Sequence, residues 1–378
     1  MKAAVFFDGY SPLHETKDPG LITIGLGRLG DIATLVTEAK GELDDYKAPF
    51  PIVMANEKNR FKDINFWRRI NADIVICYTW VDPAYNSIVE AIRKSGKKVL
   101  VKADTDGRLG YPVVPREYRL KHRHATATFA LKLWYKFYRL KGKIEQLEAV
   151  SGVLVETPKA YQNIERFLEC WGRPDLLSKF HVVPNPVTDD ITMAELAEKQ
   201  NVLISVARWN DPAKNTSMML RCSKKFLEDN PDWTLRLVGP AEHVVKQGVS
   251  EWKGGLRDRV EITGFVPHER MARLLDESRV LFVPSNWESF CIAAAEAVCM
   301  GCTVVGTPLE PLDFLVAGGF SGTLAEDFAF EHLMQALASD ASKHKQGNYN
   351  PIEIADYWRP RLSIREVVSQ IHKLLTKL

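Results

Sequence analysis

Two acidic residues, Glu288 and Glu296, flank the predicted start of a helix and give the densest chemical signal of the chain. The segment runs Val280-Leu-Phe-Val-Pro-Ser-Asn-Trp-Glu288-Ser-Phe-Cys-Ile-Ala-Ala-Ala-Glu296, which predicts a strand, a loop and a helix. We expect Ser289 to be the N-cap residue. The amides left free are then those of Phe290, Cys291 and Ile292. Free amides and the positive end of the helix dipole attract phosphate, and carboxylates on either side can accept hydrogen bonds from flanking hydroxyl groups.

The alternative for these carboxylates is that Glu288 is a solvated loop acid and Glu296 faces water. The neighbours of Glu296 argue against this alternative, because they are the small residues Ala293, Ala294, Ala295 and Ala297. Glu296 is the one polar side chain in a stretch whose composition favours tight packing. We therefore expect both carboxylates to face a ligand.

Two cations, Arg208 and Lys214, precede this segment in the chain. A predicted strand ends at Arg208, a loop with Pro212 follows, and Lys214 opens the next helix. At the carboxyl edge of a sheet, Arg can hold a diphosphate with its planar fork, and Lys can hold it as a mobile point charge. Surface Arg and Lys are common, so the pair is informative through its position. It lies in the first loop of the domain whose later strand leads into Glu288.

Short apolar runs alternate with helical patterns and supply the elements that position these residues. In the first half the expected strands are Ala3–Phe7, Pro51–Ala55, Asp73–Tyr78, Lys98–Val101 and Gly152–Glu156, and the expected helices are Asp31–Ala39, Ile64–Ile70, Ala84–Lys94 and Lys159–Glu169. In the second half the strands are Val202–Ala207, Trp233–Val238, Val280–Val283 and Thr303–Gly306, and the helices are Ser217–Leu227, Glu269–Leu275 and Ile292–Val298. This order predicts an α/β fold of two Rossmann-like, doubly wound domains facing across a cleft. Ligands of such sheets bind beyond the carboxyl ends of the strands.

Length and composition agree with two ordinary globular domains. The chain has 378 residues, of which 46% are hydrophobic and 26% charged, which excludes a disordered, collagen-like or coiled-coil protein. No uninterrupted apolar run reaches the roughly 18 residues of a membrane helix. The first residues meet Asp8 and Gly9 too early for a secretory signal, and the six cysteines do not suggest a disulfide framework. We expect buried thiols in a reducing cytoplasm.

The formal net charge of +2 does not show that basic residues are concentrated in one segment, residues 115–143. Its cations are Arg116, Arg119, Lys121, Arg123, Lys132, Lys136, Arg139, Lys141 and Lys143, and its one acid is Glu117. Phe129, Trp134, Phe137 and Tyr138 are interleaved with them. This mixture suits the anionic surface of a membrane, phosphate-rich substrates or nucleic acid, and the alternative is a solvated helix whose aromatic residues lie in the core.

A glycine run, Gly25-Leu-Gly27-Arg-Leu-Gly30, matches the dinucleotide-binding fingerprint. It does not directly follow the first predicted strand, so the match is weak. The remaining alternatives are a glycine loop at the cleft, in which Gly27 approaches the ligand, and a simple turn before a helix. An NAD(P)-dependent oxidoreductase using this loop is therefore a competing hypothesis, and a non-catalytic basic binding module is another.

Several motifs in order resemble the retaining GT-B glycosyltransferases of group 1, which carry two glutamates eight positions apart. The order is Arg208…Lys214, Leu237-Val238-Gly239, Ile262-Thr-Gly264-Phe265-Val266-Pro267, and then Pro284-Ser285…Glu288…Glu296…Gly301…Val304-Val305. Asn185-Pro186-Val187 also resembles the hinge strand of that family. The resemblance is strong over residues 181–325 and architectural in the first half. It implies an acceptor-side domain over 1–185, a donor domain over 186–358, and a C-terminal helix over 359–378 that packs back on the first domain.

The resemblance implies a role for each matching position. Arg208 and Lys214 would bind the diphosphate of a nucleotide sugar and offset the charge of the leaving group. Glu288 would bind the transferred sugar and Glu296 the ribose. The residues Ser289, Phe290, Cys291 and Ile292 would contact the distal phosphate or the sugar through the helix start, and Gly264, Phe265 and Val266 would hold the base. A UDP-sugar is favoured, no metal or other cofactor is expected, and the acceptor is a lipid-linked molecule or a glycan.

The chain also departs from the family pattern. Ala207 stands where a glycine is usual before the arginine, and the spacing from Arg208 to Lys214 is one residue longer than expected. The histidine usual in the acceptor-side domain is absent from Val101–Gly107, so Asp104 or Asp106 is the candidate for its place, with Asp104 as a catalytic candidate. A metal-binding role for Asp104-Thr105-Asp106 is disfavoured. We expect a cytoplasmic enzyme, peripheral on the cytoplasmic face of a membrane, that binds no nucleic acid.

Overall fold

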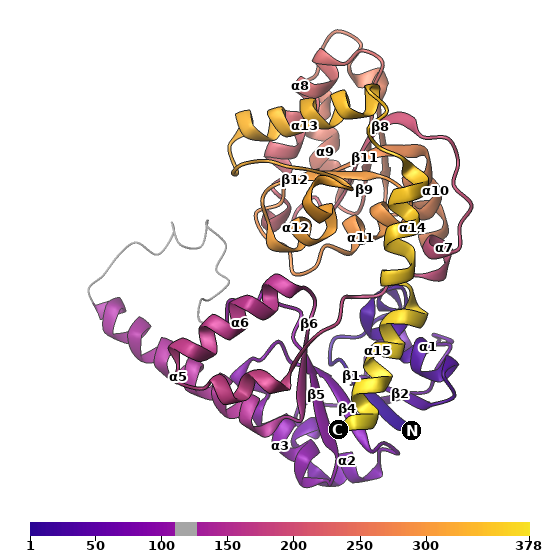
Figure 1. The fold of residues 1–378 in the computed structure, drawn as a ribbon. Helices are drawn as coiled ribbons and strands as arrows, with labels where there is room; N and C mark the ends of the chain where they lie inside the picture. Colours follow the sequence, from indigo (N-terminus) through magenta and orange to yellow (C-terminus); the bar gives the residue numbers. More distant parts are fainter. Residues whose placement is uncertain (110–126) are drawn as a thin grey trace. The chain divides into compact units, whose positions relative to one another are not determined.

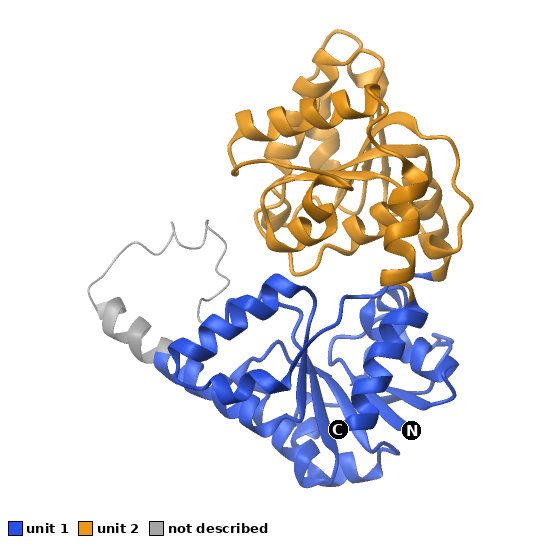
Figure 2. Ribbon diagram, viewed as in Figure 1, with its two compact units in different colours: residues 1–188, 364–378 blue, residues 189–363 orange. Residues whose placement is uncertain are grey.

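The structure is a computed structural model, and it describes residues 1–109 and 127–378. The chain divides into two compact units (Figure 2). Unit 1 comprises Met1–Thr188 and Ile364–Leu378, and unit 2 comprises Asp189–Ser363. Each unit is built on its own parallel sheet with helices on both faces (Figure 1). The chain thus passes from one unit to the other after residue 188, where the sequence suggested 185.

Unit 1 contains a seven-stranded parallel sheet in the order β3-β2-β1-β4-β5-β6-β7. The strands are β1 (Lys2–Phe6), β2 (Ile32–Glu38), β3 (Ile52–Ala55), β4 (Ile74–Tyr78), β5 (Lys98–Lys102), β6 (Gly152–Val155) and β7 (Phe180–Val182). Strand β1 pairs with β2 on one side and with β4 on the other. The direction of winding changes between β1 and β4. In doubly wound sheets ligands bind at this position, beyond the carboxyl ends of the strands.

The helices of unit 1 cover both faces of this sheet. They are α1 (Asp18–Arg28), α2 (Ile64–Arg69), α3 (Asn86–Lys94), α5 (Ala127–Ala149), α6 (Pro158–Cys170) and α15 (Ile364–Lys377). Successive residues of β1 point to opposite faces: Ala3 and Val5 lie in one core cluster, and Ala4 and Phe6 lie in the other. The first cluster is closed by α1 and by α15, which brings the C-terminal helix alongside the N-terminal segment (Figure 1).

Two predictions for the first half were wrong. Residues 31–39, predicted as a helix, contain strand β2. Leu35 and Val36 are both fully buried because both faces of this strand are covered, and such a continuous apolar run cannot be told from a helix by periodicity. The glycine run is not a loop, because Gly25 and Gly27 lie inside helix α1. A Cβ atom at Gly25 would lie 2.5 Å from a methyl carbon of Val368, so this glycine lets α1 approach α15.

Unit 2 contains a six-stranded parallel sheet in the order β10-β9-β8-β11-β12-β13. Its strands are β8 (Gln200–Val206), β9 (Thr234–Val238), β10 (Val260–Gly264), β11 (Ser278–Val283), β12 (Thr303–Gly306) and β13 (Gly322–Leu324). Its helices are α7 (Asp189–Thr192), α8 (Thr216–Asp229), α9 (Glu242–Ser250), α10 (His268–Glu277), α11 (Ile292–Cys299), α12 (Glu310–Val316), α13 (Phe330–Lys345) and α14 (Pro351–Leu362). The winding reverses between β8 and β11, so the loops that follow these two strands meet at the ligand-binding edge.

The C-terminal helix expected over 359–378 is in fact two helices. Helix α14 ends at Leu362 in unit 2, and α15 begins at Ile364 in unit 1. Ser363 separates them because its backbone is extended (φ −62°, ψ 147°). The amphipathic pattern of the two segments is nearly continuous, so the break is not visible in the periodicity.

Candidate active site

Lys214 and Glu288 form an ion pair at the carboxyl edge of the unit 2 sheet. Lys214 ends a short 3₁₀ helix, Pro212–Lys214, that follows β8, and Glu288 lies in the loop between β11 and α11. The Lys214 Nζ atom is 2.8 Å from each carboxylate oxygen, and the Ser285 hydroxyl donates to Glu288 Oε1 at 2.7 Å. Burial alone would lower the pKa of Lys214, but the buried Glu288 carboxylate outweighs it and raises that pKa. The lysine is therefore a fixed positive charge.

The two loops that carry this pair are tied together by hydrogen bonds. The Asn286 backbone N–H donates to the carbonyl of Ala213 at 2.7 Å, and its side-chain amide donates to the carbonyl of Pro212 at 3.1 Å. The Asp211 carboxylate accepts from the Ala213 N–H at 2.9 Å and so caps the short helix. Because both loops are braced, the Lys214–Glu288 geometry is set by the backbone as well as by charge.

Helix α11 begins at Ile292 as predicted, but its N-cap lies two residues later than expected. Its N-cap is Cys291, whose backbone is left-handed (φ 65°), and the carbonyl of Cys291 accepts from the amides of Ala294 and Ala295 at 2.9 and 3.1 Å. Ser289, the predicted cap, lies in the preceding loop. The short side chain of serine favours caps, but here the chain turns at a later position. The first amides of a helix have no partner within it, so the start of α11 still presents N–H groups to an anion.

The Cys291 thiol is buried at the start of α11 and is influenced electrostatically by both predicted ligand carboxylates. Burial raises the pKa of this thiol, and Glu288 and Glu296 raise it further. Glu296 is itself buried, with 7% of its surface exposed, and lies inside α11. The structure therefore places Lys214, Glu288 and Cys291 at the start of α11 and Glu296 further along the same helix.

Glu296 is bound to His268, a residue that the sequence did not single out. The Nε2 atom of His268 lies 3.0 Å from Glu296 Oε1, and its Nδ1 atom lies 3.7 Å from a carboxylate oxygen of Asp190. Burial lowers the pKa of His268, but the hydrogen bond to Glu296 and both carboxylates raise it above its usual value. His268 opens helix α10 directly after Pro267. Its position directly after the predicted base-binding turn is the sequence feature that could have identified His268 as a residue of the site.

Arg208 does not join this cluster. Its side chain is 69% exposed, and its guanidinium lies 3.0 Å from the carboxylate of Asp211, three residues along. The loop itself is closely held, because a Cβ atom at Gly239 would lie 1.9 Å from the carbonyl oxygen of Ala207. Gly239 (φ 136°) therefore lets the chain after β9 cross close to the end of β8. The guanidinium is available to a ligand once its exposed bond to Asp211 opens.

The turn after β10 presents the predicted base-binding residues. Gly264 is left-handed (φ 68°), and its carbonyl already accepts from the Gly239 amide at 2.8 Å. Val266 is buried, whereas the Phe265 side chain is 61% exposed. An exposed aromatic ring at this edge offers a flat apolar surface to a nucleotide base.

Asp104 and Gly27 lie in unit 1 and in different parts of it. Asp104 follows β5 at the carboxyl edge of the sheet. Gly27 is exposed in the last turn of α1, and the chain returns from there to the start of β2. The Ile32 N–H there donates to the carbonyl of Met1 at 3.0 Å, at the amino edge. The structure therefore corrects two predictions, the contact of Gly27 with the donor and the dinucleotide-binding loop. Gly27 lies in a helix and near the amino edge of the sheet, whereas a phosphate would bind at the carboxyl edge.

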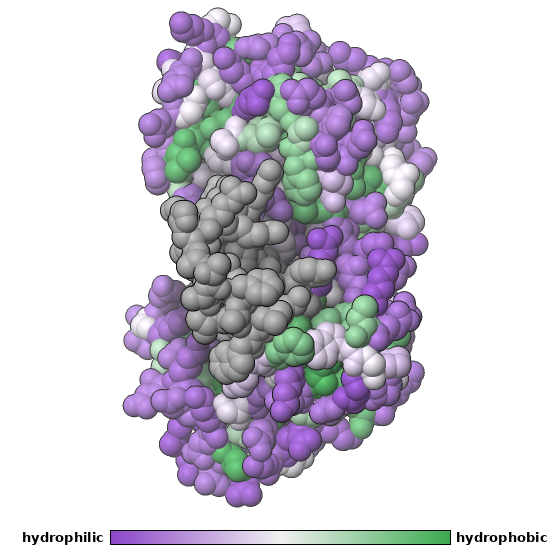
Figure 3. Space-filling model, turned by 90° about the vertical axis from the view of Figure 1, so that its left-hand side faces the viewer, coloured by the Kyte–Doolittle hydropathy of each residue, from purple (hydrophilic) through white to green (hydrophobic). Residues whose placement is uncertain are grey.

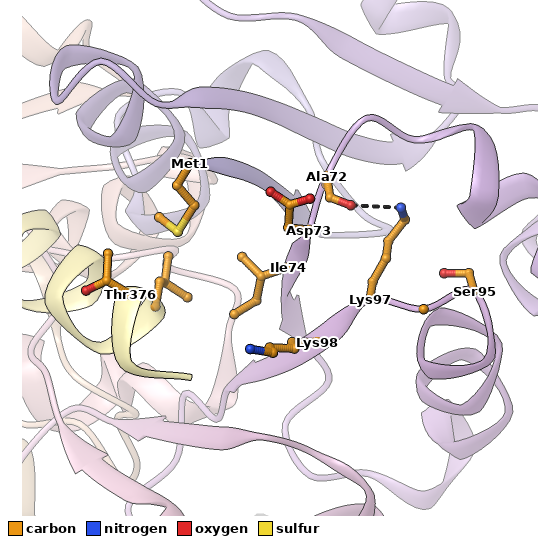
Figure 4. A pocket seen from close by; sticks show the side chains of 10 residues that line it. Met1, Ala72, Asp73, Ile74, Ser95, Lys97, Lys98 and Thr376 are labelled. Carbon is orange, nitrogen blue, oxygen red and sulfur yellow. Dashed lines mark hydrogen bonds between the residues drawn. The ribbon is translucent and has the colours of Figure 1, made fainter.

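The pocket shown in Figure 4 lies at this same amino edge of unit 1. It is lined by residues before or at the starts of β1, β4 and β5 and by the end of α15: Met1, Ala72, Asp73, Ile74, Ser95, Gly96, Lys97, Lys98, Leu375 and Thr376. The Lys97 ammonium inside it donates to the carbonyl of Ala72 at 2.8 Å (Figure 4). Ligands of parallel sheets bind at the opposite edge, so we assign no part of the site to this pocket. Within residues 1–109 and 127–378, no group of three or more His, Cys, Asp and Glu side chains is arranged to hold a metal ion.

Most of the basic segment lies outside the described residues. Arg116, Glu117, Arg119, Lys121 and Arg123 fall in the range 110–126, and the side chains of Lys132 and Lys136 are also not described. Of the cations that are described, Arg139 pairs with Asp82 at 2.6 Å and Lys143 donates to the carbonyl of Leu109 at 2.7 Å. The described residues on the face shown in Figure 3 are mostly hydrophilic, with hydrophobic ones in small groups. Among the described helices, none combines the length and apolar composition of a membrane span.

Comparison with known proteins identifies the class. Over the whole chain the fold is similar to a sucrose-phosphate synthase from Thermosynechococcus elongatus (TM-score 0.73, 16% identity, 100% of this chain and 98% of the other). It is also similar to HepE from Anabaena, solved in complex with UDP and glucose (TM-score 0.69, 15% identity, 100% of both chains). The two Rossmann-like units and these likenesses define the GT-B fold of glycosyltransferases.

The particular family follows from the second unit. Residues 188–351 match the family described as glycosyl transferases group 1, so the chain carries a glycosyltransferase domain of that group. The putative colanic acid biosynthesis glycosyltransferase WcaL of Escherichia coli is 27% identical over 164 residues, 41% of this chain and 38% of that protein. The MMP alpha-(1->4)-mannosyltransferase of Mycolicibacterium hassiacum is 24% identical over 211 residues, 53% and 49% of the two chains. In these alignments the chain spans between about a third and a half of the relatives' length.

Proposed function

We propose that this chain is a retaining glycosyltransferase that moves a sugar from a nucleotide-diphosphate sugar to a lipid-linked or glycan acceptor, without a metal ion. The observation that carries the proposal is the cluster around the start of α11. It combines a charged lysine and its buried carboxylate partner with the free amides of a helix start, and a second buried carboxylate lies further along that helix. Cations and amides suit a diphosphate, and carboxylates suit the hydroxyl groups on either side of it.

The chemistry of the proposed reaction follows from this cluster. When the bond between the sugar and the diphosphate breaks, negative charge grows on the leaving phosphate. Lys214 and the amides at the start of α11 are fixed before the reaction, so they stabilise this charge without reorganising. The planar guanidinium of Arg208 would also bind the diphosphate. We assign Glu288 to the transferred sugar and Glu296 to the ribose, and neither carboxylate is assigned as a nucleophile.

UDP is the proposed carrier, and two points support it. HepE, a protein with the same fold, was solved with UDP and with UDP-glucose. The turn at Gly264 and the exposed ring of Phe265 offer a main-chain edge and an apolar surface to a small base. We also propose that the enzyme acts in the cytoplasm at a membrane surface, where Phe137 and Tyr138, 60% and 64% exposed on α5, would enter the headgroup region.

A donor-hydrolysis screen tests the proposal. The full chain is incubated with UDP-, GDP- and ADP-sugars, and the release of nucleoside diphosphate is measured with and without EDTA. We expect release from a UDP-sugar in both conditions. Arg208→Ala should lower this release by at least about a hundredfold while unfolding stays within about 0.5 kcal/mol of wild type, because the side chain is exposed. Hydrolysis of none of these donors, or full activity of Arg208→Ala, would contradict the proposal.

A further inference from the structure

A second group of polar and aromatic side chains lies at the carboxyl edge of the unit 1 sheet. Phe7 follows β1, Trp80 follows β4, and Asp104 follows β5. The Trp80 indole N–H donates to Asp104 Oδ2 at 3.4 Å, and the two residues are the centre of the group. None of these contacts belongs to the donor cluster of unit 2.

The indole ring of Trp80 packs against two other aromatic rings. Its centroid is 6.1 Å from that of Phe7 and 5.9 Å from that of Tyr85, with interplanar angles of 71° and 63°. Tyr85 is fixed in turn, because its hydroxyl donates to Asp8 Oδ2 at 3.0 Å. Edge-to-face contacts of this kind orient the ring. Trp80 stays half-buried at the edge of the sheet.

A buried ion pair fixes the backbone of Asp104 and so positions its carboxylate. Lys102 and Glu156, both fully buried, form this pair, and the Glu156 carboxylate also accepts from the backbone amides of Asp104 and Thr105 at 3.0 and 3.2 Å. The loop after β5 is thereby fixed, with Asp104 in a left-handed conformation (φ 44°). Asp104 Oδ1 accepts no hydrogen bond from any residue that the structure describes. Asp104 is half-buried, and its Oδ1 atom keeps its capacity to accept a hydrogen bond.

A buried hydroxyl group without a partner lies beside this carboxylate. Tyr78, at the end of β4, is 2% exposed, and its hydroxyl has no hydrogen-bond partner among the described residues. Burial raises the pKa of Tyr78, and the nearby carboxylates of Asp18 and Asp104 raise it further. Burial and Asp104 also raise the pKa of Asp18 to about 7. Buried polar groups are nearly always paired in folded proteins, and the Asp18 carboxylate beside the Tyr78 hydroxyl can supply such a partner.

We propose that Trp80 and Asp104 form a subsite for a pyranose ring of the acceptor. A pyranose has an apolar face of C–H groups and a rim of hydroxyl groups. The indole face would stack on the former, and the Asp104 carboxylate, which can only accept hydrogen bonds, would bind the latter. The inference rests on the proposed function and narrows it: the group that receives the sugar is carried by a carbohydrate.

Direct binding of pyranosides to the full chain tests this inference. The probes are the methyl α-pyranosides of glucose, galactose and mannose, observed by saturation-transfer NMR in the presence of UDP. Wild type should transfer saturation to the ring C–H protons of at least one probe. Trp80→Ala should reduce its affinity at least about tenfold, and Trp80→Phe should retain most of the binding because it keeps a ring face. Asp104→Asn should also weaken binding of these probes, because the amide offers hydroxyl groups one acceptor oxygen in place of the two of the carboxylate.

Trp171→Ala is the matched control, since Trp171 is also half-buried in unit 1 but follows the end of α6, away from the carboxyl edge. It should bind the probes as wild type does. Thermal stabilisation by UDP, measured for every variant, reports that the chain is folded. Absence of saturation transfer on wild type, or retention of it in Trp80→Ala, would overturn the inference. A failure of the proposed function has a different signature, because the chain would then hydrolyse no nucleotide sugar whatever the pyranosides do.

Discussion

Replacing Lys214 by methionine distinguishes the structural role of this lysine from its proposed role in donor binding. The substitution keeps the length of the side chain and removes the ammonium group that lies 2.8 Å from both oxygens of Glu288. Glu288 is 7% exposed and would keep the Ser285 hydroxyl at 2.7 Å as its remaining side-chain partner. The variant therefore leaves a buried carboxylate with one hydrogen bond and no counter-charge.

The size of the effect follows from the burial of the two partners. Removing one partner of a fully buried ion pair costs about 3–5 kcal/mol. The Lys214 side chain is 21% exposed and Ser285 remains, so we expect a smaller loss for Lys214→Met, about 2–3 kcal/mol. Glu288→Gln added to this variant removes the uncompensated charge and should restore about half of the loss. If Lys214 also binds the diphosphate, affinity for UDP should fall about 10- to 150-fold in both variants.

Urea unfolding and calorimetric titration with UDP distinguish the two roles. Unfolding of the full chain is followed by circular dichroism, with separate transitions fitted for the two units. The double variant Lys214→Met/Glu288→Gln should recover stability without recovering affinity. Recovery of both quantities together, or wild-type affinity in Lys214→Met, would show that Lys214 serves only to neutralise Glu288, and the donor site would have to lie elsewhere.

Three further predictions concern neighbouring features. Wild type should prefer UDP over 2′-deoxy-UDP by about tenfold, and Glu296→Ala should abolish this preference, because the carboxylate is assigned to the ribose hydroxyls; equal loss for both nucleotides would place Glu296 elsewhere. His268 has a raised pKa in the folded chain, so its stabilising charge is fully present below about pH 6.5 and is lost as pH rises through the raised value. Unfolding of His268→Gln at pH 5.5 and 8.5 should therefore show a smaller stability difference than wild type. Gly25→Ala should cost about 1–3 kcal/mol through the contact with Val368, whereas Gly27→Ala, with nothing within 4 Å, should be neutral or stabilising by up to about 1 kcal/mol; similar thermal shifts in the pair would contradict the packing role.

The elements that the sequence predicted well are those whose pattern is set locally. The strands β4 and β11 are bounded apolar runs, and α6 begins at a Thr-Pro start signal that the structure uses, with Thr157 capping Ala160. The apolar run of strand β2 resembles a helical pattern because both faces of this strand are buried, with Leu35 in one core cluster and Val36 in the other. That burial is a property of the tertiary packing, which local periodicity does not contain.

The site was predicted where it depends on residues close in sequence and missed where it depends on pairing across the sheet. Glu288 and Glu296 were placed by their relation to one helix start. His268 was not, because its contact with Glu296 requires α10 to pack beside α11. The Trp80–Asp104 contact likewise requires β4 and β5 to be neighbours, which the order of the strands decides. Functional residues that come into contact only through the order of strands and the packing of helices cannot be recognised from their spacing in the sequence.

Two lysine–glutamate pairs with buried carboxylates, one in each unit, show how a buried ion pair can be assigned a role. Both lie at the carboxyl edge of a sheet, where desolvation makes such a pair costly to maintain. In unit 1 the pair Lys102–Glu156 is wholly buried. The Glu156 carboxylate also accepts hydrogen bonds from two backbone amides of the loop after β5, so the pair fixes this loop. In unit 2 the Lys214 side chain keeps 21% of its surface exposed beside helix amides that have no partner within the helix. A stabilising pair has no need of that exposure, but a cation that must also meet a diphosphate does.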